Sequence, residues 1–213
     1  MRHACSSAAT PQSNASAPTT ITATAGDGQA SVAFSGAVTN GSTIADYTVQ
    51  AYDSTGSAVS GSTCTVTTSS AGGTCEVSGL TNGSSYTFKA VTNSTANSSS
   101  VTSSLSIPTS TIIPASAPDA PTSLEVTAGT GKVTVTWTEP SANGSVILSY
   151  TVQAYDADGN AVTGATCTAT APAVTCDVSS NLAAGNNYTF KVIATNAIGP
   201  STASSASPAA AIN

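Results

Sequence analysis

The sequence has few charged residues and very few basic ones. Only 7% of its 213 residues are charged, and 4 Lys and Arg stand against 10 Asp and Glu, so the formal net charge is −6. Four basic side chains are too few to neutralise a nucleic-acid backbone or to form a polybasic membrane-binding patch, so we expect neither kind of contact. The one histidine, His3, lies in a small-residue terminal segment. We therefore expect no Ser-His-Asp triad and no multi-histidine metal site.

The sequence also lacks long apolar runs. No stretch is long enough to span a bilayer, and the first seven residues, Met1–Ser7, lack the apolar core of a signal peptide. We expect no transmembrane segment, and we expect that export uses a segment absent from this chain or that the chain is a piece of a longer protein. What is abundant is Ser and Thr, with 35 and 36 residues. Low charge with a mean hydropathy of +0.12 argues against overall disorder.

The chain contains an internal repeat. The seven residues Tyr47–Asp53 recur unchanged as Tyr150–Asp156, 103 residues later, within a collinear series of further matches. A period of this length is too long for a solenoid and fits one small domain. The sequence therefore predicts two copies of one module.

The composition places the boundaries of the two copies. We expect a disordered tail over residues 1–16 and a first copy over 17–108. A proline-flanked linker follows over 109–117, and its prolines should keep it extended. The second copy then covers residues 118–213.

Short alternating runs fill each copy. Val, Ile, Tyr and Phe alternate with Ser and Thr, and turn signals such as Gly26–Gly28 and Gly129–Gly131 separate the runs. This period of two predicts strands with one buried face, and the last strand of each copy is a run of Ser, Thr and Ala. Seven short strands per copy indicate an all-β fold of two immunoglobulin-like β-sandwiches in tandem.

Several features recur in the same order in both copies and carry a family resemblance. They are an early proline (Pro18, Pro121), an aromatic residue on the second strand (Phe34, Trp137), a tyrosine opening the third (Tyr47, Tyr150), and a Leu-x5-Tyr spacing (Leu80 and Tyr86, Leu182 and Tyr188). Together they resemble the fibronectin type III domain in its bacterial extracellular form. The resemblance implies that each Leu-x5-Tyr pair forms a structural tyrosine corner, and the four strand aromatics are expected in the cores.

The cysteines point to an oxidising compartment. Four of the five form one pair per copy, Cys64 with Cys75 and Cys167 with Cys176. Four cysteines allow three connectivities, and the repeat favours bridges within each copy. Buried free thiols are the alternative, whereas a zinc site would need more ligands than two cysteines per copy. Disulfides imply an extracellular, cell-surface or periplasmic location. Cys5 is left over, and its role stays open.

Candidate chemistry is sparse. No acid–base pair recurs in both copies, so we expect no catalytic residues, no metal site and no cofactor. The segment Asp156–Asn160 resembles the opening of a calcium loop, but its twelfth position is Cys167 where such a loop has Glu. We interpret the segment as an Asp-Gly turn, which leaves calcium binding by Asp156 and Asp158 as an open alternative.

These observations favour a protein that is not an enzyme. The resemblance implies a noncatalytic spacer, adhesion or protein-interaction element of a surface or secreted protein, as a monomeric rod or part of a larger chain. Its partner would be an unknown protein or a cell-surface glycan. The alternatives are accessory or carbohydrate-binding modules of a secreted polysaccharide-degrading enzyme, or a virion-surface decoration module.

Overall fold

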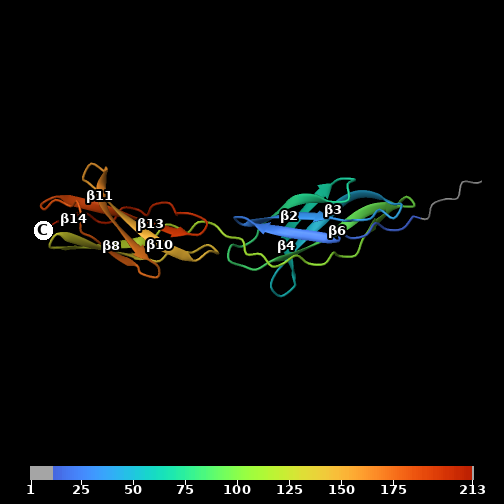
Figure 1. Cartoon of the computed structure of the whole chain (residues 1–213), viewed down its shortest axis with the longest axis horizontal. Coiled ribbons are helices and arrows are strands. Elements are labelled where there is room, and N and C mark those ends of the chain that lie inside the picture. The colour runs from blue at the N-terminus through green and yellow to red at the C-terminus, as the bar shows by residue number, and fades with distance from the viewer. Residues whose placement is uncertain (1–11, 213) are drawn as a thin grey trace, which may run out of the picture. The chain divides into compact units, whose positions relative to one another are not determined.

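The computed structural model describes residues 12–212, and the chain divides into two compact units between Pro114 and Ala115. We refer to them as the first and the second module. Each is built of β-strands (Figure 1). The part of the chain that the structure describes contains no helix that could cross a membrane.

The first module has seven strands: β1 (Thr20–Ala25), β2 (Gln29–Ser35), β3 (Thr43–Tyr52), β4 (Ala58–Thr67), β5 (Gly73–Ser78), β6 (Thr87–Ala96) and β7 (Ser99–Thr102). The second has β8 (Thr122–Gly129), β9 (Lys132–Thr138), β10 (Ile147–Tyr155), β11 (Ala161–Thr170), β12 (Thr175–Val178), β13 (Asn187–Asn196) and β14 (Ala210–Ala211).

Each module is a sandwich of two antiparallel sheets. In the first module the sheets have the strand orders β1-β2-β5 and β4-β3-β6-β7, and in the second β8-β9-β12 and β11-β10-β13-β14. The first six strands of each module therefore take equivalent places, whereas β7 pairs with the end of β6 and β14 with the start of β13. The prediction of two seven-stranded immunoglobulin-like sandwiches in tandem is confirmed.

Each module has its own core, formed by the inward-facing residues of its two sheets. Burial alternates along the central strands, as it does along β6 and β13. The largest fully buried side chains are Tyr47, Phe88, Tyr150 and Phe190, and the next largest are all valines. Because most core side chains are small, each sandwich buries a modest apolar area, and edge contacts matter more than in a bulky core.

The amino-terminal segment differs from the expected tail. Ser13 and Ser16 donate backbone hydrogen bonds to carbonyls of the loop between β2 and β3, and Ala15 is only 2% exposed. Residues 12–16 therefore pack on the first module, whereas the rest of the expected tail, 1–11, lies outside the described residues. The internal repeat relates this contact to one in the second module. Ser116 lies 103 residues after Ser13, and its N–H donates an equivalent backbone hydrogen bond.

The expected linker over 109–117 is also largely part of the modules. Ile112 exchanges two backbone hydrogen bonds with Tyr86, the residue before β6, and the carbonyl of Pro114 accepts one from a loop of the same module. The N–H of Ser116 already donates to a loop of the second module. Ala115 is the one residue between these two anchored positions.

The expected final strand is mostly not a strand. After β7, and before β14, the chain follows β6 or β13 and contacts it at every third residue. We call these contacts the serine ladder, and its members are Ser103, Ser106, Thr109, Ser201, Ser204 and Ser207. Between successive contacts the segment that carries these residues advances by three residues, while its partner strand advances by two. Its rise per residue is therefore smaller than that of a β-strand.

Each rung of the serine ladder joins two residues by two hydrogen bonds. The N–H of Ser204 donates to the carbonyl of Val192 at 2.9 Å, and the Oγ of Ser204 accepts from the N–H of Val192 at 3.0 Å. The same hydroxyl donates to the carbonyl of Ser205 at 2.8 Å. A short hydroxyl side chain thus replaces a backbone carbonyl as the acceptor for the strand, which leaves the edge of β13 paired.

Loss of a rung hydroxyl should destabilise the second module. In Ser204→Ala the buried N–H of Val192 loses its acceptor, so we expect the free energy of unfolding to fall by about 1–3 kcal/mol. Ser205→Ala, at an exposed neighbour, should change it by less than about 0.5 kcal/mol. Urea unfolding of both variants measures the difference, and equal losses would contradict the ladder.

Candidate functional site

A disulfide joins the two sheets of each module at their edges. Cys64 of β4 pairs with Cys75 of β5, and Cys167 of β11 pairs with Cys176 of β12. The Cα atoms lie 6.1 and 6.2 Å apart, within the usual range for a disulfide. Both bridges are within a module, and in each sheet the bridged strand is an edge strand. The bridge therefore closes one open side of the sandwich.

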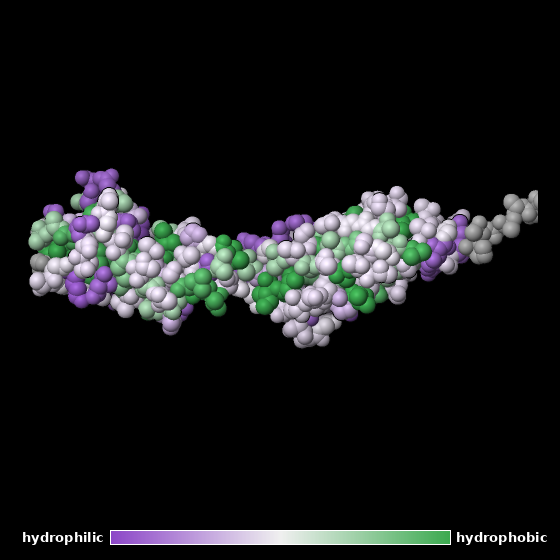
Figure 2. Space-filling view, viewed as in Figure 1, coloured by the Kyte–Doolittle hydropathy of each residue, from purple (hydrophilic) through white to green (hydrophobic). Residues whose placement is uncertain are grey.

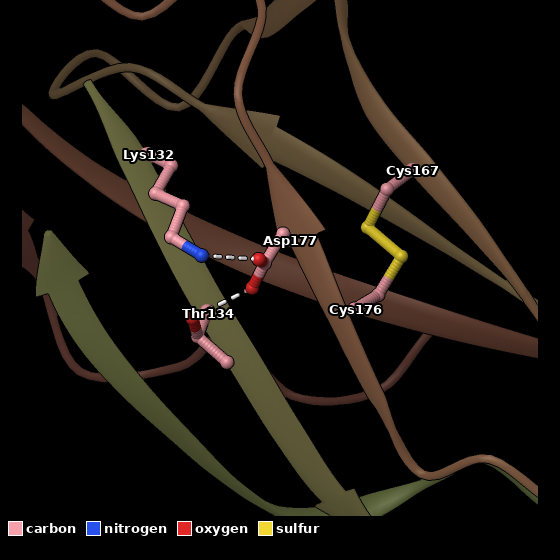
Figure 3. A network of polar contacts seen from close by, with 5 residues as sticks. All are labelled: Lys132, Thr134, Cys167, Cys176 and Asp177. Atoms are coloured by element: carbon pink, nitrogen blue, oxygen red, sulfur yellow. Dashed lines mark hydrogen bonds and ion pairs between the residues drawn. A yellow bond between two sulfur atoms is a disulfide. The ribbon is translucent and has the colours of Figure 1, made fainter. Parts of the chain in front are cut away.

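Charged side chains lie beside the second bridge (Figure 3). Asp177 follows Cys176 on β12, so its side chain points to the opposite side of the strand. There it pairs with the ammonium of Lys132 and accepts a hydrogen bond from the hydroxyl of Thr134. The bond from Lys132, and then that from Thr134, lower the pKa of Asp177. Because both partners of the ion pair are nearly half exposed, the pair adds little stability.

The four strand aromatics lie in the cores. Phe34 and Tyr47 have ring centroids 4.8 Å apart in the first module, and Trp137 and Tyr150 lie 5.1 Å apart in the second. All four are at most 5% exposed. The two modules thus carry the same tilted aromatic pair between their sheets.

The hydroxyls of the two core tyrosines have different surroundings. Tyr47 donates to the carbonyl of Ser70 at 2.9 Å, across the loop between β4 and β5. In the second module the equivalent loop is shorter, and neither the hydroxyl of Tyr150 nor the indole N–H of Trp137 has a hydrogen-bond partner. Burial raises the pKa of Tyr47, and burial followed by the charge of Glu139 raises that of Tyr150.

The Leu-x5-Tyr pairs lie where the chain crosses between the sheets. The hydroxyl of Tyr86 accepts a hydrogen bond from the N–H of Thr81, and that of Tyr188 accepts one from Ala183, each at 3.0 Å. The preceding leucines pack on the cores: Leu80 is buried and Leu182 is half-buried. Each hydroxyl therefore bonds the backbone five residues upstream, which is the geometry of a tyrosine corner.

Local structure accounts for the glutamine in the identical stretch of seven residues. Gln50 follows the core residue Val49, and a register shift separates it from Tyr52. Its Nε2 lies 2.8 Å from the carbonyls of Ala51 and Val59. Gln153 makes equivalent bonds in the second module. The glutamine thus satisfies carbonyls that the bulge leaves unpaired, a role that we did not foresee from the sequence.

The turn that follows this stretch is held by an aspartate. The Oδ1 of Asp53 accepts hydrogen bonds from the hydroxyl of Thr55 and from the N–H groups of Ser57 and Thr55. These bonds, that from the hydroxyl first, lower the pKa of Asp53. Asp156 accepts equivalent bonds from Asp158 and from the residue two positions further on. This arrangement is an Asx turn. Across residues 12–212, no three His, Cys, Asp or Glu side chains gather as metal ligands do.

Asn196 is a further buried polar residue that sequence reasoning missed. It is 3% exposed, and its Nδ2 donates to the carbonyl of Ser116 at 2.8 Å. Its Oδ1 accepts from the N–H groups of Ile198 and Gly199. One side chain thus holds the start of the second module and the loop after β13. The first module has Ser94 at the equivalent place, where it meets the N–H of Ala15.

The outer surface is weakly polar. The face seen in Figure 2 is mostly pale, the colour of residues of intermediate hydropathy, and strongly hydrophilic groups are scattered. This intermediate hydropathy arises because threonine occupies many outward-facing strand positions. In β4, for example, Thr63, Thr65 and Thr67 are all exposed. Such a surface offers many hydroxyls and few charges.

Comparisons with known proteins agree with this geometry. Residues 16–109 and 119–209 each match the fibronectin type III domain. Chitinase A1 of Niallia circulans is 37% identical over 142 residues, which cover 65% of this chain and 19% of that protein. The titin domains A168–A170 align over 93% of this chain and 65% of theirs, with a TM-score of 0.51 and 21% identity. The chicken CNTN1 FN1-FN3 domains align over 95% and 65%, with a TM-score of 0.45 and 17% identity.

Two matches in tandem over most of the sequence define the class of this protein. The chain belongs to the fibronectin type III family and consists of two such domains, one after the other. The likeness to titin shows the fold alone. The chain spans about a fifth of the length of Chitinase A1, which it matches only in part.

The two core tyrosines should respond differently to loss of the hydroxyl. Tyr47→Phe removes a hydrogen bond, so we expect it to lower the free energy of unfolding by about 0.5–1.5 kcal/mol. Tyr150→Phe removes a buried hydroxyl that has no partner, so stability should stay the same or rise. Chemical denaturation tests this matched pair, and an equal loss in both variants would show that Tyr150 has a partner.

Proposed function

We propose that this chain is a noncatalytic spacer of an extracellular protein, which holds neighbouring parts of that protein or its partners at a set separation. Two self-contained sandwiches, each with its own core and disulfide, support this role. The disulfides favour an oxidising compartment outside the cytosol.

The junction between the modules carries the proposal. Pro114 is hydrogen-bonded within the first module and Ser116 within the second, so Ala115 alone is left to bend freely. The end-to-end distance and the conformational freedom of a flexible linker grow with every residue added. A linker of one residue has only two soft backbone dihedral angles. A junction of this length limits the range of relative orientations, which a spacer requires.

A second candidate function has a specific observation in its favour. The partial match to Chitinase A1 supports a role as accessory domains in a secreted enzyme that degrades a polysaccharide. The spacer role is compatible with it, since accessory domains separate a catalytic domain from a polymer surface.

Insertion at the junction tests the spacer role. In solution, residual dipolar couplings of the two modules should report alignment tensors of similar magnitude, because restricted modules align together. Insertion of a Gly-Ser-rich segment after Ala115 should make the two tensors unequal while each module keeps its fold. Unequal tensors in the native chain would contradict the spacer role.

The enzyme context is tested on the natural gene product. An antibody raised against this chain should capture from the culture medium a polypeptide that hydrolyses an insoluble polysaccharide such as chitin. Capture of a secreted product without hydrolytic activity on any of a panel of polysaccharides would contradict the second candidate and leave the spacer role standing.

A further inference from the structure

Two aromatic side chains have no part in the cores. Eight of the ten aromatic residues are 7% exposed or less. The other two, Tyr52 and Tyr155, are half-buried and occupy equivalent positions at the end of the identical stretch. Each module therefore presents one aromatic ring to solvent, at the same place in its fold.

A lysine lies over each of these rings. The Nζ of Lys89 is 4.6 Å from the ring centroid of Tyr52, and that of Lys191 is 4.9 Å from the ring centroid of Tyr155. The lysines come from β6 and β13, the strands paired with β3 and β10. Ring and ammonium thus share the outer face of the larger sheet in each module, where the cation–π contact holds them together.

A groove lies next to each tyrosine in the chain, between the turn after it and the start of β6 or β13. In the first module its lining includes Asp53, which follows Tyr52, and Thr87, which pairs with Tyr52 across the sheet. The volume of the groove is about 400 Å³ in the first module and about 380 Å³ in the second. Asp53, Ser54, Gly56, Ser85, Tyr86, Thr87 and Thr111 line the first groove. Asp156, Ala157, Asp158, Gly185, Asn186, Asn187 and Tyr188 line the second. The two grooves occupy equivalent positions, and both have polar linings: the first is rich in hydroxyl groups, and the second in carboxylate and amide groups.

We propose that the Tyr–Lys pair and the adjoining groove form, in each module, a contact site for a neutral, hydroxyl-rich polysaccharide. The inference rests on the second candidate function and names the surface that would meet the polymer. A sugar ring presents an apolar C–H face that can stack on a tyrosine once the lysine side chain swings off the ring. The lysine can be displaced, because a cation–π contact at an exposed site is weak. The hydroxyls of the sugar can donate to the Asp carboxylate, and its oxygens can accept from the lysine ammonium.

Charge favours a neutral polymer over an acidic one. The grooves contribute carboxylates and uncharged groups, one lysine adjoins each, and the whole chain carries a formal net charge of −6. An anionic polymer would meet repulsion from most of this surface.

The test is a nuclear magnetic resonance titration of the full chain with the hexamer of β-1,4-linked N-acetylglucosamine and with cellohexaose. We expect saturable shifts of amide signals around Tyr52 and Tyr155 with at least one of these probes. In Tyr52→Leu, binding at the first module should weaken at least about fivefold, as expected for loss of one aromatic contact. The second module, unchanged in the same molecule, serves as the internal control.

Further variants separate the ring from other effects. Tyr52→Phe keeps the ring and should keep most of the binding, and Glu76→Gln, on the outer face of the other sheet, should leave it unchanged. The absence of saturable shifts with both probes, or binding that survives Tyr52→Leu, would overturn the inference. Polysaccharide hydrolysis by the captured gene product does not depend on Tyr52. If hydrolysis were observed while the titration showed no binding, this inference would fail and the second candidate function would stand.

Discussion

The disulfide between two sheet edges is the constraint on which each module depends. The cores are small, since most of their fully buried side chains are no larger than valine. Closing loops of 11 and 9 residues should stabilise each module by about 2.5–3 kcal/mol in the chain-entropy model. Small domains are stable by only about 5–15 kcal/mol in total, so this is a substantial share. The bridge also fixes which strands form the closed side of the sandwich.

The opposite edge of each larger sheet is closed without a covalent bond. Along β6 and β13 the serine ladder supplies backbone donors and hydroxyl acceptors at every third residue. The high serine content therefore has two structural reasons: buried hydroxyls complete the backbone hydrogen bonds of an edge, and exposed ones keep the surface polar with few charges. Such an edge resists pairing with another chain.

Much of the fold could be predicted from the sequence, because it rests on local patterns that occur twice. The alternation of apolar and polar residues predicted the strands, and the turn residues predicted where the strands end. The internal repeat predicted the two modules and the pairing of the cysteines. The serine ladder could not be predicted, because a period of three has meaning only beside a partner strand whose position is not local. For the same reason the bonds of Gln50 and Asn196, and the unpaired hydroxyl of Tyr150, required the structure.

The central claim is that each module is a sandwich closed by its own disulfide. Mass-spectrometric peptide mapping of the unreduced protein tests it most directly. The account predicts linked peptides containing Cys64 with Cys75 and Cys167 with Cys176, in nearly all molecules. Free thiols at these four positions, or a bridge from one module to the other, would contradict it.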